Sequence, residues 1–177
     1  NLEEFSRMSR MVSDMLFLAQ ADNNQLIPEQ QALDLAEEVH KVFEFFEAWA
    51  EEKAVALRFV GSPCRVTGDP LMLRRAISNL LSNAIRYTPA GQAVTIQLSE
   101  SAETVRLVVE NPGTPIAAEH LPRLFDRFYR VDPSRQRKGE GSGIGLAIVK
   151  SIVGAHHGSV AAQSDLRSTR FIVVLPK

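Results

Sequence analysis

The sequence predicts an α/β fold in which a mixed, mostly antiparallel sheet packs against helices as a two-layer sandwich. Segments with helical spacing of apolar residues are interleaved along the chain with short segments in which every second residue is apolar. The later strands follow one another across short turns, which indicates hairpins. Hairpins are antiparallel, so a layered sandwich is favoured over a doubly wound parallel sheet.

The composition is that of an ordinary globular domain. The chain has 177 residues, 45% hydrophobic and 23% charged, which suits one compact domain with an appendage. Its 20 Lys+Arg and 21 Asp+Glu nearly cancel, so no field attracts nucleic acid or an anionic membrane. The single Cys64 excludes a disulfide framework and fits a reducing compartment. No apolar run reaches the roughly 20 residues of a membrane span, and no signal peptide opens the chain.

Residues 2–20 are predicted to form a helix that packs in a bundle or coiled coil. A plain surface helix of the domain itself is the alternative. Because the chain begins inside this amphipathic pattern, we expect the sequence to be a fragment. The polar residues 23–33 predict a linker, with a short strand expected at Leu26–Ile27. The seam of the first helix has a 3-4-3-4 spacing and consists of Phe5, Met8, Val12, Met15 and Ala19.

The next helix begins at Asp34. Glu37 stands three residues later, which is the spacing of a capping box, and the helix is expected to reach about Lys53. Short strands are predicted at 55–60 and 65–67. One face of the helix carries aromatic residues that we assign to the core, namely Phe43, Phe46 and Trp49.

A further helix starts at Asp69, where an acidic cap is followed by Pro70 in the first turn, and it runs to about Tyr87. Alternating apolar residues then predict two strands, at 94–98 and 105–109, joined by a polar turn.

The C-terminal third contains two helices and a hairpin. A short helix is predicted at 119–128, before a charged, Gly-rich segment at 132–145. That segment runs into an apolar helix that ends near His157. The final strands are predicted at 159–163 and 169–175.

The strongest local signal is Gly139-Glu-Gly141-Ser-Gly143-Ile-Gly145, which opens the apolar helix. Glycine at every second position lets a backbone approach a polyanion, and the helix offers N–H groups and the positive end of its dipole. The dinucleotide fingerprint and the Gly-Lys-Ser/Thr triplet of the Walker loop are both absent. A Gly-rich loop alone is weak support for phosphate binding.

The second signal is a polar face on the helix after Asp69. Asn79, Asn83, Arg86 and Tyr87 stand at i, i+4, i+7 and i+8 and so share one face. Asparagine is a poor helix former, and an amide oxygen is a hard ligand suited to Mg²⁺. A polar binding site is therefore favoured over a solvated face. The core residues that point away from this face are Leu80, Leu81, Ala84 and Ile85.

These motifs resemble those of sensor histidine kinases. Residues 79–89 resemble the family's N box, 121–130 (LPRLFDRFYR) its F box, and 141–146 its second glycine box, in matching order and spacing. The resemblance covers roughly 24–177 and implies the ATP-binding catalytic domain of the Bergerat fold. Residues 1–22 look like the end of the second helix of the dimerisation and histidine-phosphotransfer domain.

This resemblance implies a domain order and an activity. The order is the helix end at 1–22, a linker at 23–33 and the catalytic domain at 34–177. The activity is transfer of the γ-phosphoryl group of MgATP to a histidine of the dimerisation domain, and then to an aspartate of a response regulator. The run at 123–153 looks most like copper- and silver-responsive sensor kinases, which are homodimers of the bacterial inner membrane with cytoplasmic catalytic domains.

The resemblance also implies residue roles. Asn83 would ligate the Mg²⁺ that bridges the ATP phosphates, with Asn79 beside it and Arg130 near the γ-phosphate, and these three are the predicted catalytic residues. Tyr87 would pack against the adenine, and Arg86 stands where the family usually has a lysine. The other predicted ATP-binding residues are Asn111, Gly113, Ile116, Gly141, Ser142, Gly143, Ile144, Gly145 and Leu146.

The F box has a different implied role. Phe125 and Phe128 would anchor the lid over the nucleotide. Arg127 and Lys138 are candidates for extra phosphate contacts, with solvated charge as the alternative for each.

One motif departs from the family. Its first glycine box reads Asp-x-Gly-x-Gly, whereas this chain has Asn111-Pro-Gly-Thr-Pro115. Asn111 can accept from and donate to adenine but lacks the charge that strengthens a hydrogen bond. We expect ATP to bind about tenfold more weakly than to a relative with Asp, a difference of roughly 1.4 kcal/mol. Glu110 is not a substitute, because alternation places it on the opposite face of the strand.

The sequence favours transfer over hydrolysis. ATP hydrolases of this fold carry a water-activating glutamate where this chain has Asn79, which has no basicity. A degenerate binding module is the other alternative, given the altered glycine box. The acceptor motif His-Glu/Asp-x-x-Thr/Asn-Pro is absent, so the chain is expected to bind MgATP without phosphorylating itself. The histidines that lack this context are His40, His120, His156 and His157.

Overall fold

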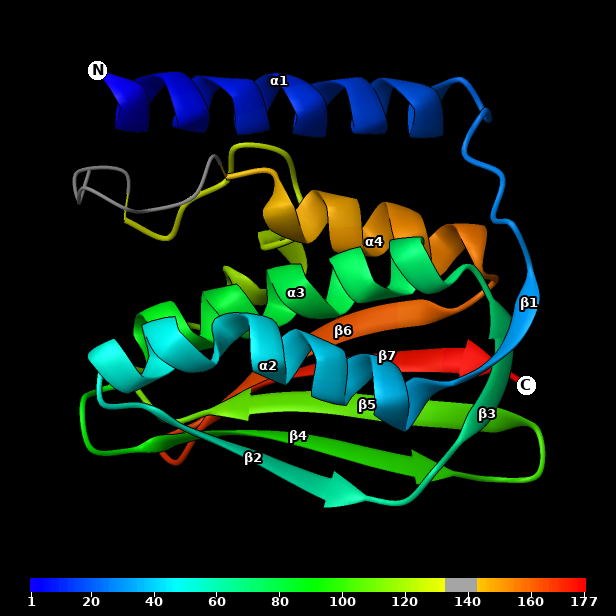
Figure 1. Cartoon of the computed structure of the whole chain (residues 1–177). Coiled ribbons are helices and arrows are strands. Elements are labelled where there is room, and N and C mark those ends of the chain that lie inside the picture. The colour runs from blue at the N-terminus through cyan, green and yellow to red at the C-terminus, as the bar shows by residue number, and fades with distance from the viewer. Residues whose placement is uncertain (133–142) are drawn as a thin grey trace.

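The computed structural model describes residues 1–132 and 143–177. Its helices are α1 (Leu2–Asp22), α2 (Leu35–Glu52), α3 (Pro70–Tyr87) and α4 (Gly145–Ala155), with a 3-10 turn η1 (Leu121–Arg123). Its strands are β1 (Gln31–Asp34), β2 (Ala56–Gly61), β3 (Arg65–Gly68), β4 (Ala93–Glu100), β5 (Thr104–Asn111), β6 (Ser159–Ser164) and β7 (Thr169–Pro176). Figure 1 shows α2, α3 and α4 on one face of the larger sheet, with α1 lying over α4.

The larger sheet has five strands in the order β2-β4-β5-β7-β6. Strand β2 pairs with β4 in parallel, and the other neighbouring pairs are antiparallel. The hairpins β4–β5 and β6–β7 confirm the strands predicted from alternation. A mixed, mostly antiparallel sheet with helices on one face confirms the predicted sandwich, since a doubly wound sheet carries helices on both faces.

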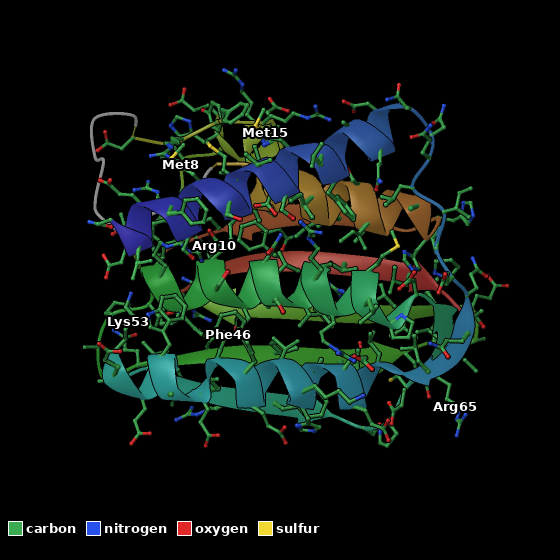
Figure 2. All side chains as sticks on the ribbon, turned by 45° about the horizontal axis from the view of Figure 1, so that its top comes forward. Met8, Arg10, Met15, Phe46, Lys53 and Arg65 are labelled. Carbon is green, nitrogen blue, oxygen red and sulfur yellow. The ribbon has the colours of Figure 1, made fainter. Side chains whose placement is uncertain are left out.

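The core lies between the sheet and the helix layer. The predicted core residues of α3 are buried, with Leu81, Ala84 and Ile85 at 0% exposure. Because one side of α3 is buried in this way, the opposite side, with Asn79 and Asn83, lies at the edge of the core and is half-buried. On α2, Phe46 lies between α2 and α3 and packs against the core (Figure 2).

Both predicted helix starts are confirmed. The Asp34 carboxylate accepts a hydrogen bond from the backbone N–H of Ala36 at 3.0 Å, and the Asp69 carboxylate accepts one from Met72 at 3.1 Å. Each bond satisfies an N–H group that has no partner inside the helix. Pro70 occupies the first turn of α3, where its missing N–H has no cost.

The short strand predicted at Leu26–Ile27 is wrong. The strand in this part of the chain is β1, at Gln31–Asp34, which pairs antiparallel with β3. Pro28 lacks an N–H to donate to a strand partner, which disfavours pairing around it. β1 directly precedes α2, and its pairing partner β3 lies more than 30 residues further along the chain. The strand therefore depends on a distant partner.

The helix predicted at 119–128 is also wrong. Only the 3-10 turn η1 forms there, and Phe128 has a φ of 62°, which a right-handed helix cannot contain. The apolar residues in this segment pack into the core without forming a helix. Phe125 is buried and meets the ring of Phe171 edge-on, with 6.1 Å between the ring centroids.

Helix α1 has features of both predicted alternatives, a helix that packs in a bundle or coiled coil and a surface helix of the domain itself. Its seam is exposed to solvent, and Figure 2 shows Met8 and Met15 on one side of the helix with Arg10 on the other. Near its C-terminal end α1 packs on the domain, where Leu18 is only 2% exposed. Asp14 also forms an ion pair with Arg75 of α3 at 2.7 Å. Within the described ranges no helix has both the length and the apolar character of a membrane span.

Candidate functional site

Three segments meet at the C-terminal half of α3: α3 itself, the loop at 111–116 after β5, and the start of α4. The Asn79 side-chain amide donates a hydrogen bond to the carbonyl oxygen of Gly145 at 3.1 Å, which joins α3 to α4. On the other side, a Cβ atom on Gly113 would lie 2.9 Å from the carbonyl oxygen of Tyr87. Only glycine permits this close approach, so Gly113 lets the loop pack against the end of α3.

The polar face of α3 is arranged as the sequence predicts. Asn79 and Asn83 lie one helical turn apart and are half-buried, followed by the half-buried Arg86 and the exposed Tyr87. Asn79 is held by Gly145. The Asn83 side chain makes no hydrogen bond to any part of the chain that the structure describes, so its amide oxygen is available to a ligand.

The start of α4 has the geometry of an anion site. Ile144 occupies the N-cap position and supplies no side-chain hydrogen bond to the first turn of α4. Among the described residues no side chain accepts a hydrogen bond from the first N–H groups of α4, which form the positive end of the helix dipole. Gly143 has a φ of 81°, and a Cβ atom there would lie 3.1 Å from Cα of Phe128. The carbonyl oxygen of Gly143 accepts a hydrogen bond from the Phe128 N–H at 2.8 Å, which ties the F box to this segment.

The other predicted site residues are less uniformly placed. Ile144 is fully buried, and Leu146 packs against the core. Ile116 donates its backbone N–H to Ser164 Oγ at 2.9 Å. Arg130 is half-buried near the end of the described F-box segment. Lys138, Gly141 and Ser142 lie outside the described residues.

Asn111 is 4% exposed and lies on the side of β5 that faces the helices. Its amide nitrogen donates to the carbonyl oxygen of Pro112 at 2.9 Å. Glu110 lies on the opposite side of the sheet, as alternation predicts. There it accepts a hydrogen bond from Ser168 Oγ at 2.8 Å and pairs with Arg170 at 3.8 Å. Glu110 is therefore committed to the outer face and does not replace the missing Asp.

Arg127 contacts α1. Its guanidinium donates to the carboxylate of Asp22 at 2.5 Å. This hydrogen bond lowers the pKa of Asp22 and raises the pKa of Arg127. A shallow groove of about 430 Å³ lies beside this pair, and its lining includes Leu18, Phe125, Arg127, Ala147 and Lys150. Asn83 does not line this groove. No local pattern could reveal this pair, because the partners are 105 residues apart.

His156 is a further residue next to the α3–α4 pair. From the sequence alone, His156 is predicted only to lie at the C-terminal end of a helix, where a partial positive charge on its ring interacts favourably with the helix dipole. In the structure it is 5% exposed, and its Nε2 atom accepts a hydrogen bond from the backbone N–H of Asp69 at 3.0 Å. The partners are 87 residues apart, so no local pattern could have revealed the contact.

Comparisons with known proteins identify the family. Residues 68–177 match the family model described as histidine kinase-, DNA gyrase B-, and HSP90-like ATPase. The chain is 72% identical over 176 residues to the sensor histidine kinase CusS of Escherichia coli strain K12, covering 99% of this chain and 37% of that protein. It is 64% identical over 181 residues to the probable sensor kinase SilS of Salmonella typhimurium, covering 100% of this chain and 36% of that protein. The chain thus spans little more than a third of the length of these curated relatives.

Solved structures support the same assignment. Full-length ShkA in complex with AMPPNP has a TM-score of 0.87 and 26% identity, covering 98% of this chain and 36% of that chain. The family match at 68–177 contains α3, the loop after β5 and α4, which are the three segments of the site. The chain therefore belongs to the histidine kinase-, DNA gyrase B- and HSP90-like ATPase family.

Proposed function

We propose that this chain binds MgATP between α3 and the start of α4 and supplies the catalytic site for phosphorylation of a histidine. The observation that carries the proposal is the hydrogen bond from Asn79 to Gly145, which brings the amide-bearing face of α3 to the N-terminus of α4. A cation ligand and an anion site then lie side by side, as a magnesium-bound triphosphate requires.

The residues suit both components. Asn83 offers a half-buried amide oxygen, and Mg²⁺ usually takes only one or two protein oxygens. When bound, the ion neutralises charge on the phosphates. We assign the phosphate contacts to the backbone at 141–146, with Arg86 and Arg130 as the nearby cations.

We assign the adenine end of the site to the loop after β5. Asn111 would recognise the adenine through its amide, and Tyr87 would pack against the ring. Gly113 and Ile116 would complete this end, since Gly113 brings the loop against Tyr87. The hydrogen bond from Asn111 to the Pro112 carbonyl limits what its amide can offer the base.

The site favours transfer over hydrolysis. Asn79 occupies the position from which hydrolases of this fold activate water, and its amide is neutral and already bonded to Gly145. A neutral imidazole needs no strong base, so positioning and charge stabilisation suffice. In the transfer a bond forms between the imidazole nitrogen and the γ-phosphorus. The bond from that phosphorus to the bridging oxygen breaks, and ADP and a proton leave.

The acceptor would belong to the rest of the protein. We assign residues 1–22 to the end of the dimerisation domain, 23–33 to the linker and 34–177 to the catalytic domain. The exposed seam of α1 would pack in the homodimer of the full-length protein. The phosphoryl group would pass to a receiver aspartate of a response regulator. By family likeness, the full protein would be a bacterial inner-membrane sensor of copper or silver, with this domain in the cytoplasm.

Calorimetric titration with ATP and ADP, with and without Mg²⁺, tests nucleotide binding. Asn83→Ala removes the proposed Mg²⁺ ligand and is expected to raise the dissociation constant for MgATP at least tenfold, about 1.4 kcal/mol, and to reduce its dependence on Mg²⁺. Gln97→Ala removes an exposed amide from β4 and serves as the matched control. Failure of the unsubstituted chain to bind at millimolar nucleotide, or equal binding by both variants, contradicts the proposal.

Phosphotransfer is tested with γ-labelled ATP and a separately made dimerisation domain. We expect label on a histidine of that domain and no acid-labile phosphohistidine on the isolated chain. The altered loop at Asn111 and Pro115 favours a degenerate nucleotide-binding module as the second candidate. Nucleotide binding without transfer would support that module. Steady release of phosphate would indicate a hydrolase.

A further inference from the structure

His156 ends α4, and both nitrogens of its buried ring lie against backbone groups. The backbone N–H of Asp69 donates to Nε2 at 3.0 Å, and Nδ1 lies 2.8 Å from the carbonyl oxygen of Ile152. A Cβ atom on Gly68 would lie 2.9 Å from Cδ2 of the ring. The ring therefore packs directly on the backbone that leads into α3.

These partners select one form of the imidazole. A backbone N–H can only donate, so Nε2 must carry a lone pair, and a carbonyl oxygen can only accept, so Nδ1 must carry the hydrogen. His156 is therefore neutral and protonated at Nδ1. A second proton would place an N–H of the ring against the N–H of Asp69, and it would bury a charge.

The surrounding charged groups do not compensate for such a proton. The Asp69 carboxylate is the charged group at this end of α3, and its oxygens already accept from the N–H groups of Met72 at 3.1 Å and Glu29 at 2.9 Å. The side chains of Glu29, in the segment before β1, and His157, after α4, are exposed. Protonation of His156 therefore costs the hydrogen bond to Asp69 without a prearranged replacement.

Polar contacts join α4 to α3 at both ends of α4. At its start, the Gly145 carbonyl accepts from Asn79 at 3.1 Å, and at its end His156 accepts from Asp69. Helix α4 has 11 residues and is therefore about 16 Å long, at roughly 1.5 Å per residue. A continuous helix of this length moves as a unit, so a shift at His156 is carried to Gly145.

We infer that His156 is a positioning residue for the nucleotide site: its neutral ring holds α4 in register along α3, which keeps the Gly145 end of α4 against Asn79. The inference rests on the proposed nucleotide site. Loss of the hydrogen bond to Asp69 is expected to weaken nucleotide binding.

The test measures ATP affinity by calorimetric titration at about pH 7.5. The matched variants are His156→Gln, which places an amide oxygen near Nε2, and His157→Gln at the exposed neighbour. We expect His157→Gln to bind ATP as the unsubstituted chain does.

His156→Met keeps the volume and removes the acceptor, so we expect it to bind ATP about tenfold more weakly at pH 7.5, while His156→Gln stays within about threefold of the unsubstituted chain. Circular dichroism shows which variants fold, and the ring ¹⁵N spectrum of the unsubstituted chain decides the matter if His156→Met does not fold. Equal ATP affinity of the folded His156→Met and His156→Gln variants overturns the inference. So does a ring ¹⁵N spectrum that shows His156 protonated at Nε2. If the unsubstituted chain fails to bind ATP at pH 7.5, the proposed function fails instead.

Discussion

Asn111 combines two requirements that oppose each other. It is 4% exposed and donates to the carbonyl oxygen of Pro112 at 2.9 Å, which stabilises the loop. Under the proposed function, a carboxylate at this position would accept a charge-assisted hydrogen bond from adenine but could not donate to Pro112. In that case Asn111 would lower the affinity for ATP and raise the stability of the loop.

We predict that Asn111→Asp tightens ATP binding about tenfold, because charge-assisted hydrogen bonds are roughly twice as strong as neutral ones. The same change should lower the free energy of unfolding of the nucleotide-free chain by about 1–3 kcal/mol, the cost of leaving buried polar groups unsatisfied. Calorimetric titration measures the first effect, and denaturant unfolding measures the second. Asn111→Ala serves as the control, since it should lose stability without gaining affinity. Unchanged or weaker ATP binding by Asn111→Asp contradicts the prediction.

Single residues differ in how far the sequence reveals their role. The face shared by Asn79 and Asn83 follows from helical periodicity, which is a local property, and the burial of Leu81 and Ile85 on the other side confirms it. The role of His156 could not be predicted in this way. Its partner Asp69 comes from the start of another helix, and only the packing of α4 on α3 brings the two together.

Secondary-structure elements also differ in this way: those with a long local pattern were predictable, and those that depend on distant packing were not. Long helices and hairpins were predictable because many residues repeat one pattern, as in α3 and in β4–β5. The strand β1 and the turn η1 are only a few residues long, so their form depends on what they pack against. β1 exists through its pairing with β3, and the residues after η1 are bent by the left-handed conformation of Phe128.

At the scale of the whole molecule, α4 connects the parts. Its start meets Asn79 at the proposed site, its end meets the cap of α3 through His156, and its outer side faces α1 (Figure 1). Helix α1 in turn contacts α3 through Asp14 and the F box through Asp22. The position of α1 is thus linked to the same helices that build the site.

The contact between Asp22 and Arg127 makes the docking of α1 dependent on pH. The hydrogen bond from Arg127 lowers the pKa of Asp22 below its ordinary value of 3.8, so the contribution of the pair is present above that value and is lost as the pH falls through the lowered pKa. We predict that Asp22→Asn and Arg127→Gln each speed hydrogen exchange in the last turns of α1 at pH 7, but not in β5, because the pair holds only that end of the helix.

Since both side chains are exposed, the effect should be small and should shrink at 1 M salt, where the screening length is about 3 Å. Arg10→Gln, at an exposed position of the same helix, should leave the exchange unchanged. Equal exchange in all three variants at pH 7, or a difference from the unsubstituted chain that grows below pH 3.8, would show that this pair does not hold α1.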